Sequence, residues 1–279
     1  MPDNSVLLVP VHASNRLQMP LLLVLMLLFP LLMVPGASAQ ESARGLVASF
    51  RQQVDHQVTI PSAEQRRYAA QLTQALIDAG RADIPSQYVV LVDRNVFVQT
   101  AMIFWKSPDG DFDFIGASQA STGQPGRFEH FETPLGVFEH GLENPDFRAE
   151  GTRNELGILG YGRKGLRVYD FGWVKAPKGW GDGHTSVMRL QMHSTDPELL
   201  EPRLGSIQSK GCIRIPASLN RFIDHYGLLD AAYERAIAAG ESFWVLPPDR
   251  EPTPWSGEFL VVIDTQRDRR PAWSPAPHR

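Results

Sequence analysis

The chain has 279 residues, of which 43% are hydrophobic, and its 27 basic and 31 acidic side chains give a formal net charge of −4. This balance leaves no excess of positive charge to hold a phosphate backbone, so we expect no nucleic-acid partner. The 23 glycines and 22 prolines are typical of a globular protein with many turns, and a single cysteine excludes an internal disulfide.

The N-terminal segment has the pattern of an export signal. Residues 19–34 are almost all apolar and are followed by the small residues Ala37-Ser-Ala39, which predicts a signal peptide over residues 1–39. Pro20 and Pro30 interrupt the apolar run, which is shorter than the roughly 20 residues that span a bilayer. We therefore favour cleavage over an uncleaved anchor, and expect no stable membrane span afterwards. The expected location is the periplasm or the cell envelope.

Residues 40–86 are predicted to form a small helical appendage at the N-terminus. Apolar residues recur at helical spacing over residues 41–56. A second helix is predicted to begin with a capping box between Ser62 and Gln65 and to end at Gly80. This segment contains no chemistry-bearing motif, so packing or partner binding is the favoured role.

From residue 87 the apolar pattern changes from helical to extended, and residues 87–248 are predicted to form one mainly β domain. Strands are expected at 87–92, 96–105, 112–120, 131–138 and 186–192. Short strands separated by turns favour a β sandwich or barrel of mixed strands with short helices. Residues 144–183, rich in glycine and charge, are expected to be irregular, as either a wall or lid over a site or a plain surface insertion.

The C-terminal part is predicted to return to helices and strands. Helices are expected at 218–226 and 228–239, strands at 241–246 and 257–263. Residues 249–279 would thus hold a strand and a flexible tail.

The only cysteine, Cys212, lies in the stretch from Gly205 to Ile215, and His193 follows directly on the strand predicted upstream of it. A cysteine and a histidine that meet in space are the minimum for thiolate chemistry. A free thiol is unusual in an exported protein, because oxidising compartments favour paired cysteines. Its presence is easier to explain by a reactive thiol than by an inert buried cysteine.

The neighbouring residues suggest how such a thiol would work. Because a free cysteine is mostly protonated at neutral pH, His193 is expected to take the thiol proton and later return it to the departing amine. The backbone N–H groups of Gly211 and Cys212 are candidate oxyanion donors. Arg214 shares a face with Cys212 in an extended segment, where it would orient a substrate carboxylate or serve the structure.

A metal site is the less favoured interpretation of these residues. His184, His193 and Cys212 are the residues that would build a zinc site, but the sequence lacks a close ligand pair such as Cys-x-x-Cys. We therefore expect no metal.

Four motifs occur in a fixed order along the chain: Ser121-Thr-Gly-Gln-Pro-Gly126, Thr133-Pro-Leu-Gly-Val-Phe138, His193-Ser-Thr195 and Ser209-Lys-Gly-Cys-Ile-Arg214. Together they resemble the catalytic domain of the L,D-transpeptidase (YkuD-like) family, whose signature around the nucleophile is Ser-His-Gly-Cys-x-Arg. The resemblance covers about residues 87–246.

The resemblance implies a β-sandwich enzyme that acts on peptidoglycan stem peptides without a cofactor. In the family, the thiol attacks the carbonyl between a diamino acid and a terminal D-alanine, releases D-alanine and passes the acyl group to an amine of a second stem. Two alternatives stay open: hydrolysis, as an L,D-carboxypeptidase or an amidase that detaches a protein from peptidoglycan, and a non-catalytic envelope binding protein. An envelope protein is therefore also a candidate acceptor or substrate.

The sequence departs from the family signature at Lys210, where the family usually has histidine. A lysine does not share a proton as an imidazole does at neutral pH, but its charge still stabilises a nearby thiolate. By the resemblance, we expect Ser209 and Lys210 to join Arg214 in binding substrate, with Lys210 either contacting a stem carboxylate or remaining solvated.

Overall fold

The computed structural model describes residues 45–277, so the predicted signal peptide lies outside the described residues. Within this range, no helix is both long and apolar enough to cross a membrane. All of these residues fall within one compact unit.

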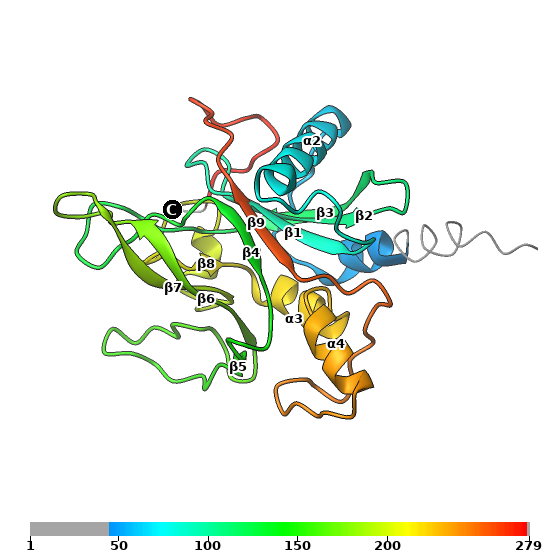
Figure 1. The fold of residues 1–279 in the computed structure, drawn as a ribbon. Helices are drawn as coiled ribbons and strands as arrows, with labels where there is room; N and C mark the ends of the chain where they lie inside the picture. The colour runs from blue at the N-terminus through cyan, green and yellow to red at the C-terminus, as the bar shows by residue number, and fades with distance from the viewer. Residues whose placement is uncertain (1–44, 278–279) are drawn as a thin grey trace, which may run out of the picture. The chain divides into compact units, whose positions relative to one another are not determined.

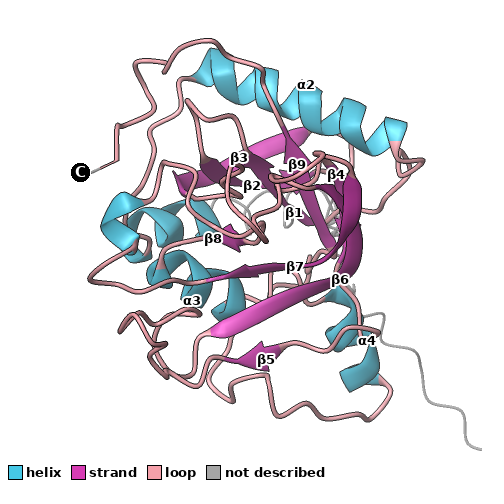
Figure 2. Cartoon of the chain, turned by 90° about the vertical axis from the view of Figure 1, so that its left-hand side faces the viewer, coloured by secondary structure: helices cyan, strands magenta, loops and turns pink. Residues whose placement is uncertain are grey.

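The strands form two mixed sheets (Figures 1 and 2). Their bounds are β1 Tyr88–Asp93, β2 Thr100–Lys106, β3 Phe112–Gln119, β4 Gly136–Glu139, β5 Phe147–Arg148, β6 Arg167–Pro177, β7 Thr185–His193, β8 Ile213–Arg214 and β9 Phe259–Ile263. One sheet has the order β3-β2-β1-β9-β4 and the other the order β5-β6-β7-β8. The expectation of a mainly β protein with mixed strands is confirmed, whereas the described strands form no closed barrel.

The five-stranded sheet is covered on both faces, which explains why β1 is a continuous apolar run. Strand alternation places Val90 and Val92 in a core shared with Leu190 of β7, between the two sheets. On the other face, Val89 packs in a second core with helix α2 (Ser62–Asp78). Figure 2 shows α2 lying along this outer face.

The N-terminal helices are built into the same cores as the sheets. Residues 45–53 are helical, and the ring of Phe50 lies 5.3 Å from that of Phe222 in the core between the sheets. Helix α2 begins where expected, but its N-cap is Pro61 and no side chain caps it, so the predicted capping box is wrong. Ser62 is already inside the first turn, and the Gln65 amide donates instead to the carbonyl of Ile60.

The C-terminal strand is part of the central sheet. It was expected at 257–263 and is found as β9, parallel to β1 and antiparallel to β4. The domain boundary predicted at residue 248 would therefore separate β9 from its own sheet. The strand expected at 241–246 is wrong, because these residues form turns that bring the carbonyl of Val245 to Arg148. In the tail, Ser274 is buried and its hydroxyl donates to the carbonyl of Val98.

Strand β6 lies inside the segment that was expected to be irregular. Its pairing with β7 shifts between Asp170 and Trp173, and Gly172 at this bulge has a φ of +77°. A bulge interrupts the alternation of apolar and polar residues, so the sequence shows no strand period here. Two helices follow the site segment, α3 (Ala217–His225) and α4 (Ala231–Ala238), each ending near a glycine with positive φ as predicted.

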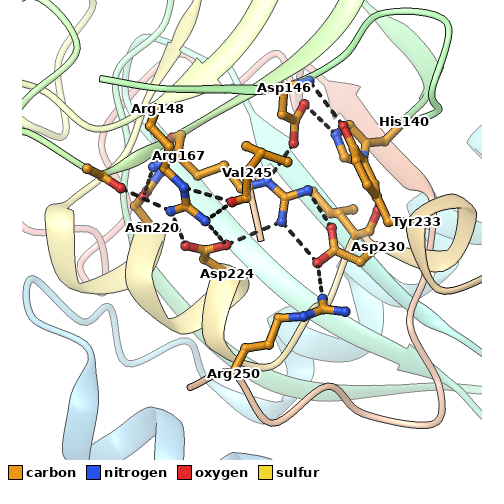
Figure 3. A network of polar contacts seen from close by, with 12 residues as sticks. His140, Asp146, Arg148, Arg167, Asn220, Asp224, Asp230, Tyr233, Val245 and Arg250 are labelled. Atoms are coloured by element: carbon orange, nitrogen blue, oxygen red, sulfur yellow. Dashed lines mark hydrogen bonds and ion pairs between the residues drawn. The ribbon is translucent and has the colours of Figure 1, made fainter. Parts of the chain in front are cut away.

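A buried network of charges joins β6 to α3 and α4 (Figure 3). The fully buried guanidinium of Arg167 lies 2.6 Å from Asp146, 3.2 Å from Asp224 and 2.7 Å from Asp230. Arg148 also binds Asp224, at 2.5 Å. Burial alone would lower the pKa of Arg167, but the carboxylates around it raise that pKa well above its ordinary value. The charges are thus compensated inside the protein.

His140 belongs to the same network and carries a charge. Its Nδ1 lies 2.7 Å from the carbonyl of Leu229, and its Nε2 lies 2.8 Å from the Asp146 carboxylate (Figure 3). Both partners only accept hydrogen bonds, so both ring nitrogens carry a proton. Burial opposes this charge, but Asp146 outweighs it, and the pKa of His140 is raised.

Candidate active site

The parallel pairing of β7 with β8 places His193, the last residue of β7, beside Arg214, and Cys212 directly precedes β8. The register of β7 and β8 pairs Met192 with Ile213 and His193 with Arg214. Met192 and Ile213 point into the core between the sheets. Because side chains alternate along a strand, His193 and Arg214 point to the opposite face, and continuing this alternation by one residue places Cys212 on that face as well. The sequence prediction that a cysteine and a histidine meet on adjacent segments therefore fits the strand pairing.

His193 is held as a neutral base. Its side chain is 5% exposed, and Nδ1 lies 2.5 Å from the carbonyl of Ser194. A carbonyl only accepts, so Nδ1 carries the proton and Nε2 keeps its lone pair. Burial lowers the pKa of His193 to about 4. The hydrogen bond to Ser194 acts in the opposite direction, and the charge of Arg214 lowers the pKa further. At neutral pH this imidazole is ready to accept a proton at Nε2.

The thiol of Cys212 rests in its protonated form. The residue is partly buried, and its Sγ donates to the carbonyl of Arg189 at 3.7 Å. Burial raises the pKa of the thiol, and this outweighs the opposing effects of a backbone bond at Gln191 and of the Arg214 charge. The resting pair is therefore a neutral thiol and a neutral imidazole, in contrast to a preformed thiolate–imidazolium pair.

The loop that carries the thiol is fixed by two buried hydroxyl groups. Ser209, which is 1% exposed, accepts a hydrogen bond from the N–H of Gly211 at 3.0 Å and donates to the carbonyl of Cys212 at 2.5 Å. Thr133 donates to the carbonyl of Gly211 at 2.7 Å and accepts from the N–H of Gly123 at 2.8 Å. Three of the four sequence motifs thus meet at this loop.

These bonds change two of the expected roles. The N–H of Gly211 donates to Ser209, so it does not point toward a substrate as an oxyanion donor. The N–H of Cys212 has no acceptor among residues 45–277, and it is the donor that remains for an oxyanion. Ser209 positions the loop and is too buried to bind a substrate.

Arg214 is a partly buried cation that neighbours His193 in the strand register and lies two residues after Cys212. The only hydrogen bond of its side chain in the described part of the chain is a long one, 3.4 Å from Nη1 to the carbonyl of Gln208, and its Nε is buried without a partner. None of the described carboxylates forms an ion pair with it. Burial lowers the pKa of Arg214. A desolvated guanidinium without an internal counter-ion is suited to an anionic group of a ligand.

Lys210 forms an exposed ion pair. Its ammonium lies 3.2 Å from Glu129, and both side chains are exposed. The backbone carbonyl of Lys210 accepts a hydrogen bond from the N–H of Phe131. Phe131 packs at 4.8 Å against Trp180, which contacts the exposed Phe128. The lysine therefore lies at the outer rim, beside a small aromatic wall.

Residues 149–166 form the other wall of the site, and they supply a residue that the sequence analysis missed. The ring of Tyr161 packs edge to face on His193, with centroids 4.7 Å apart. Its hydroxyl donates to Gln191 at 2.9 Å, and Gln191 donates to Asp170 at 2.7 Å. The only sequence signal was the position of Gln191, two residues before His193 and hence on the same face of β7.

This wall is anchored at its base and at its centre. Arg148 and Arg167, which flank it in the chain, both belong to the buried network, and Arg148 also donates to the carbonyl of Gly165 (Figure 3). Asp196 accepts from the N–H of Leu159 in the middle of the loop. Of the two interpretations for this part of the chain, a wall of the site is the one that the contacts support.

The residues considered for a zinc site do not form a metal-binding group. The side chain of His184 is 81% exposed and lies 3.5 Å from Asp182. Across residues 45–277, no group of three or more histidine, cysteine, aspartate or glutamate side chains is arranged to hold a metal ion.

Comparison with protein-family models gives no match for this chain, and no curated protein matches it either. The inferred chemistry therefore rests on the residues of the site and on the resemblance of the four motifs.

Proposed function

We propose that this chain is a cysteine-dependent acyltransferase that acts on peptidoglycan stem peptides in the cell envelope, as an L,D-transpeptidase. The proposal is supported by the location of Cys212 directly before β8, whose parallel partner β7 ends at His193, and by the tautomer of His193, which leaves Nε2 free. The motif resemblance supplies the substrate class. The contacts that join three of those motifs around Gly211 support it.

In the first half of the reaction, Sγ of Cys212 attacks the carbonyl carbon of the donor stem while its proton passes to Nε2 of His193. The oxyanion accepts a hydrogen bond from the N–H of Cys212. The C–N bond then breaks, and His193 gives its proton to the leaving amine of D-alanine. The product is a thioester on Cys212.

In the second half, the acceptor amine attacks the thioester. His193 takes the proton of the amine, the C–S bond breaks, and the proton returns to the sulfur. If water attacks in place of the amine, the same site is a hydrolase, so the two activities differ only in what reaches the thioester.

Arg214 links donor binding to the strength of the base. It lies opposite His193 in the strand register, and its charge is one of the factors that lower the pKa of His193. A donor carboxylate bound to Arg214 would cancel this effect and make His193 a stronger base. Proton transfer from the thiol would thereby be favoured when a donor is present.

The test uses purified sacculi and muropeptide analysis. With the purified protein we expect new cross-links between stems, which Cys212→Ala abolishes. Trimmed stems without new cross-links would overturn the transferase proposal in favour of a hydrolase. An unchanged sacculus, together with no covalent adduct on Cys212 after incubation with an acylating carbapenem, would favour the alternative that the chain is a non-catalytic envelope binding protein.

A further inference from the structure

We propose that Tyr161 is a positioning residue that fixes the plane of the His193 imidazole, and that Gln191 and Asp170 hold Tyr161 for this purpose. The inference rests on the catalytic pair of the proposed function. It concerns a residue that takes no part in the bonds that are made and broken.

The first step is the contact between the two rings. The planes of Tyr161 and His193 meet at 71°, so the tyrosine ring limits rotation of the imidazole about its χ2 bond. On the other side, Ser194 holds Nδ1 of the imidazole at 2.5 Å. Together the two contacts fix where Nε2 points, which decides whether it can accept the proton of the thiol.

The second step is the anchoring of the tyrosine hydroxyl. It donates to Gln191, whose amide donates to the buried carboxylate of Asp170. Asp170 also accepts from the N–H of Gly172 at 2.8 Å and from Arg189 at 2.7 Å. Because the Asp170 carboxylate only accepts, the amide nitrogen of Gln191 faces Asp170 and its oxygen faces Tyr161.

The third step is the support behind the ring. Phe147 packs on Tyr161 at 5.4 Å, on β5 at the base of the loop. Gly162, the residue after Tyr161, has a φ of +81°, and a Cβ there would lie 2.8 Å from the hydroxyl of Ser194. The loop therefore fits closely against the residue whose carbonyl holds His193.

A proton-shuttle role for Tyr161 is disfavoured. Burial raises the pKa of its phenol, and the neighbouring Cys212 raises it further. The phenol proton is also committed to Gln191. Tyr161 is thus a neutral group that acts through His193.

The experiment measures the acylation of Cys212 by a carbapenem as a function of pH, which requires no peptidoglycan. The variants are Tyr161→Ala, which removes the ring, and Tyr161→Phe, which removes only the anchor. Leu156→Ala is the matched control, because Leu156 lies in the same loop with 80% exposure. His193→Ala gives the rate without the base, and thermal unfolding checks that each variant folds.

We expect His193→Ala to lower the acylation rate at neutral pH on the order of 100-fold and Tyr161→Ala on the order of 10-fold. Tyr161→Phe should lie between Tyr161→Ala and the parent, and Leu156→Ala should equal the parent. The pH profile of Tyr161→Ala should shift toward that of His193→Ala. If Tyr161→Ala does not fold, the comparison of Tyr161→Phe with Leu156→Ala decides.

Two failures can be told apart. A normal rate and pH profile for both tyrosine variants, with a low rate for His193→Ala, would overturn the positioning role alone. A normal rate for His193→Ala would overturn the catalytic pair and with it the proposed function.

Discussion

Replacing Ser209 by alanine should loosen the loop that presents the thiol. The hydroxyl is buried and joins the N–H of Gly211 to the carbonyl of Cys212, so Ser209→Ala leaves two buried polar groups without partners. Each such group costs about 1–3 kcal/mol. We therefore expect a loss of about 2–6 kcal/mol in the free energy of unfolding. For a chain of this size, the unfolding midpoint should fall by roughly 4–24 °C.

The matched control is Ser206→Ala in the same loop, where the hydroxyl donates to the carbonyl of Arg203 in an exposed position. Its effect should stay within about 0.5 kcal/mol. Calorimetry or urea unfolding of both variants provides the measurement. Equal stability of Ser209→Ala and Ser206→Ala would show that the bridge across Gly211 does not hold the loop.

Three further predictions follow from other contacts. Gly211→Ala should destabilise the protein by about 1–3 kcal/mol, measured by urea unfolding, because φ is +130° and a Cβ would lie 2.7 Å from Met188. Because the pKa of His140 is raised in the folded protein, its stabilising effect is complete below its unfolded pKa and is lost as the pH rises through the higher folded value. Thermal unfolding midpoints measured against pH should fall above neutral pH, and midpoints that do not change there would contradict this. Arg214→Gln should raise the pKa of His193, measured by NMR titration, because the Arg214 charge lowers it.

Local patterns in the sequence predicted the buried strands and missed the irregular ones. The continuous apolar runs of β1 and β2 identify central strands, since both faces of their sheet are covered. Strand β6 was not predicted, because the bulge at Gly172 breaks the two-residue alternation of apolar and polar side chains. The place of β9 beside β1 was also not predictable, because its partner lies about 170 positions away in the chain and apolar pattern alone does not specify partners.

The residues of the site were also predictable only in part. Two short motifs mark Cys212 and His193 in the sequence, and the register of β7 and β8 brings the segments that carry them side by side. The role of the Gly211 N–H was not predictable, since it depends on a backbone conformation that turns this group toward Ser209. Tyr161 lies in a loop without periodicity, and only the folded chain brings it to His193.

The neutral resting pair has a consequence for the lifetime of the protein. Oxidants and foreign disulfides react with the thiolate form of cysteine, so a thiol with a raised pKa is oxidised slowly. In the oxidising compartment proposed here, a permanently ionised cysteine without a partner would be converted to sulfenic acid or to a mixed disulfide. Keeping Cys212 protonated until a donor strengthens His193 would protect the sulfur that the proposed reaction uses.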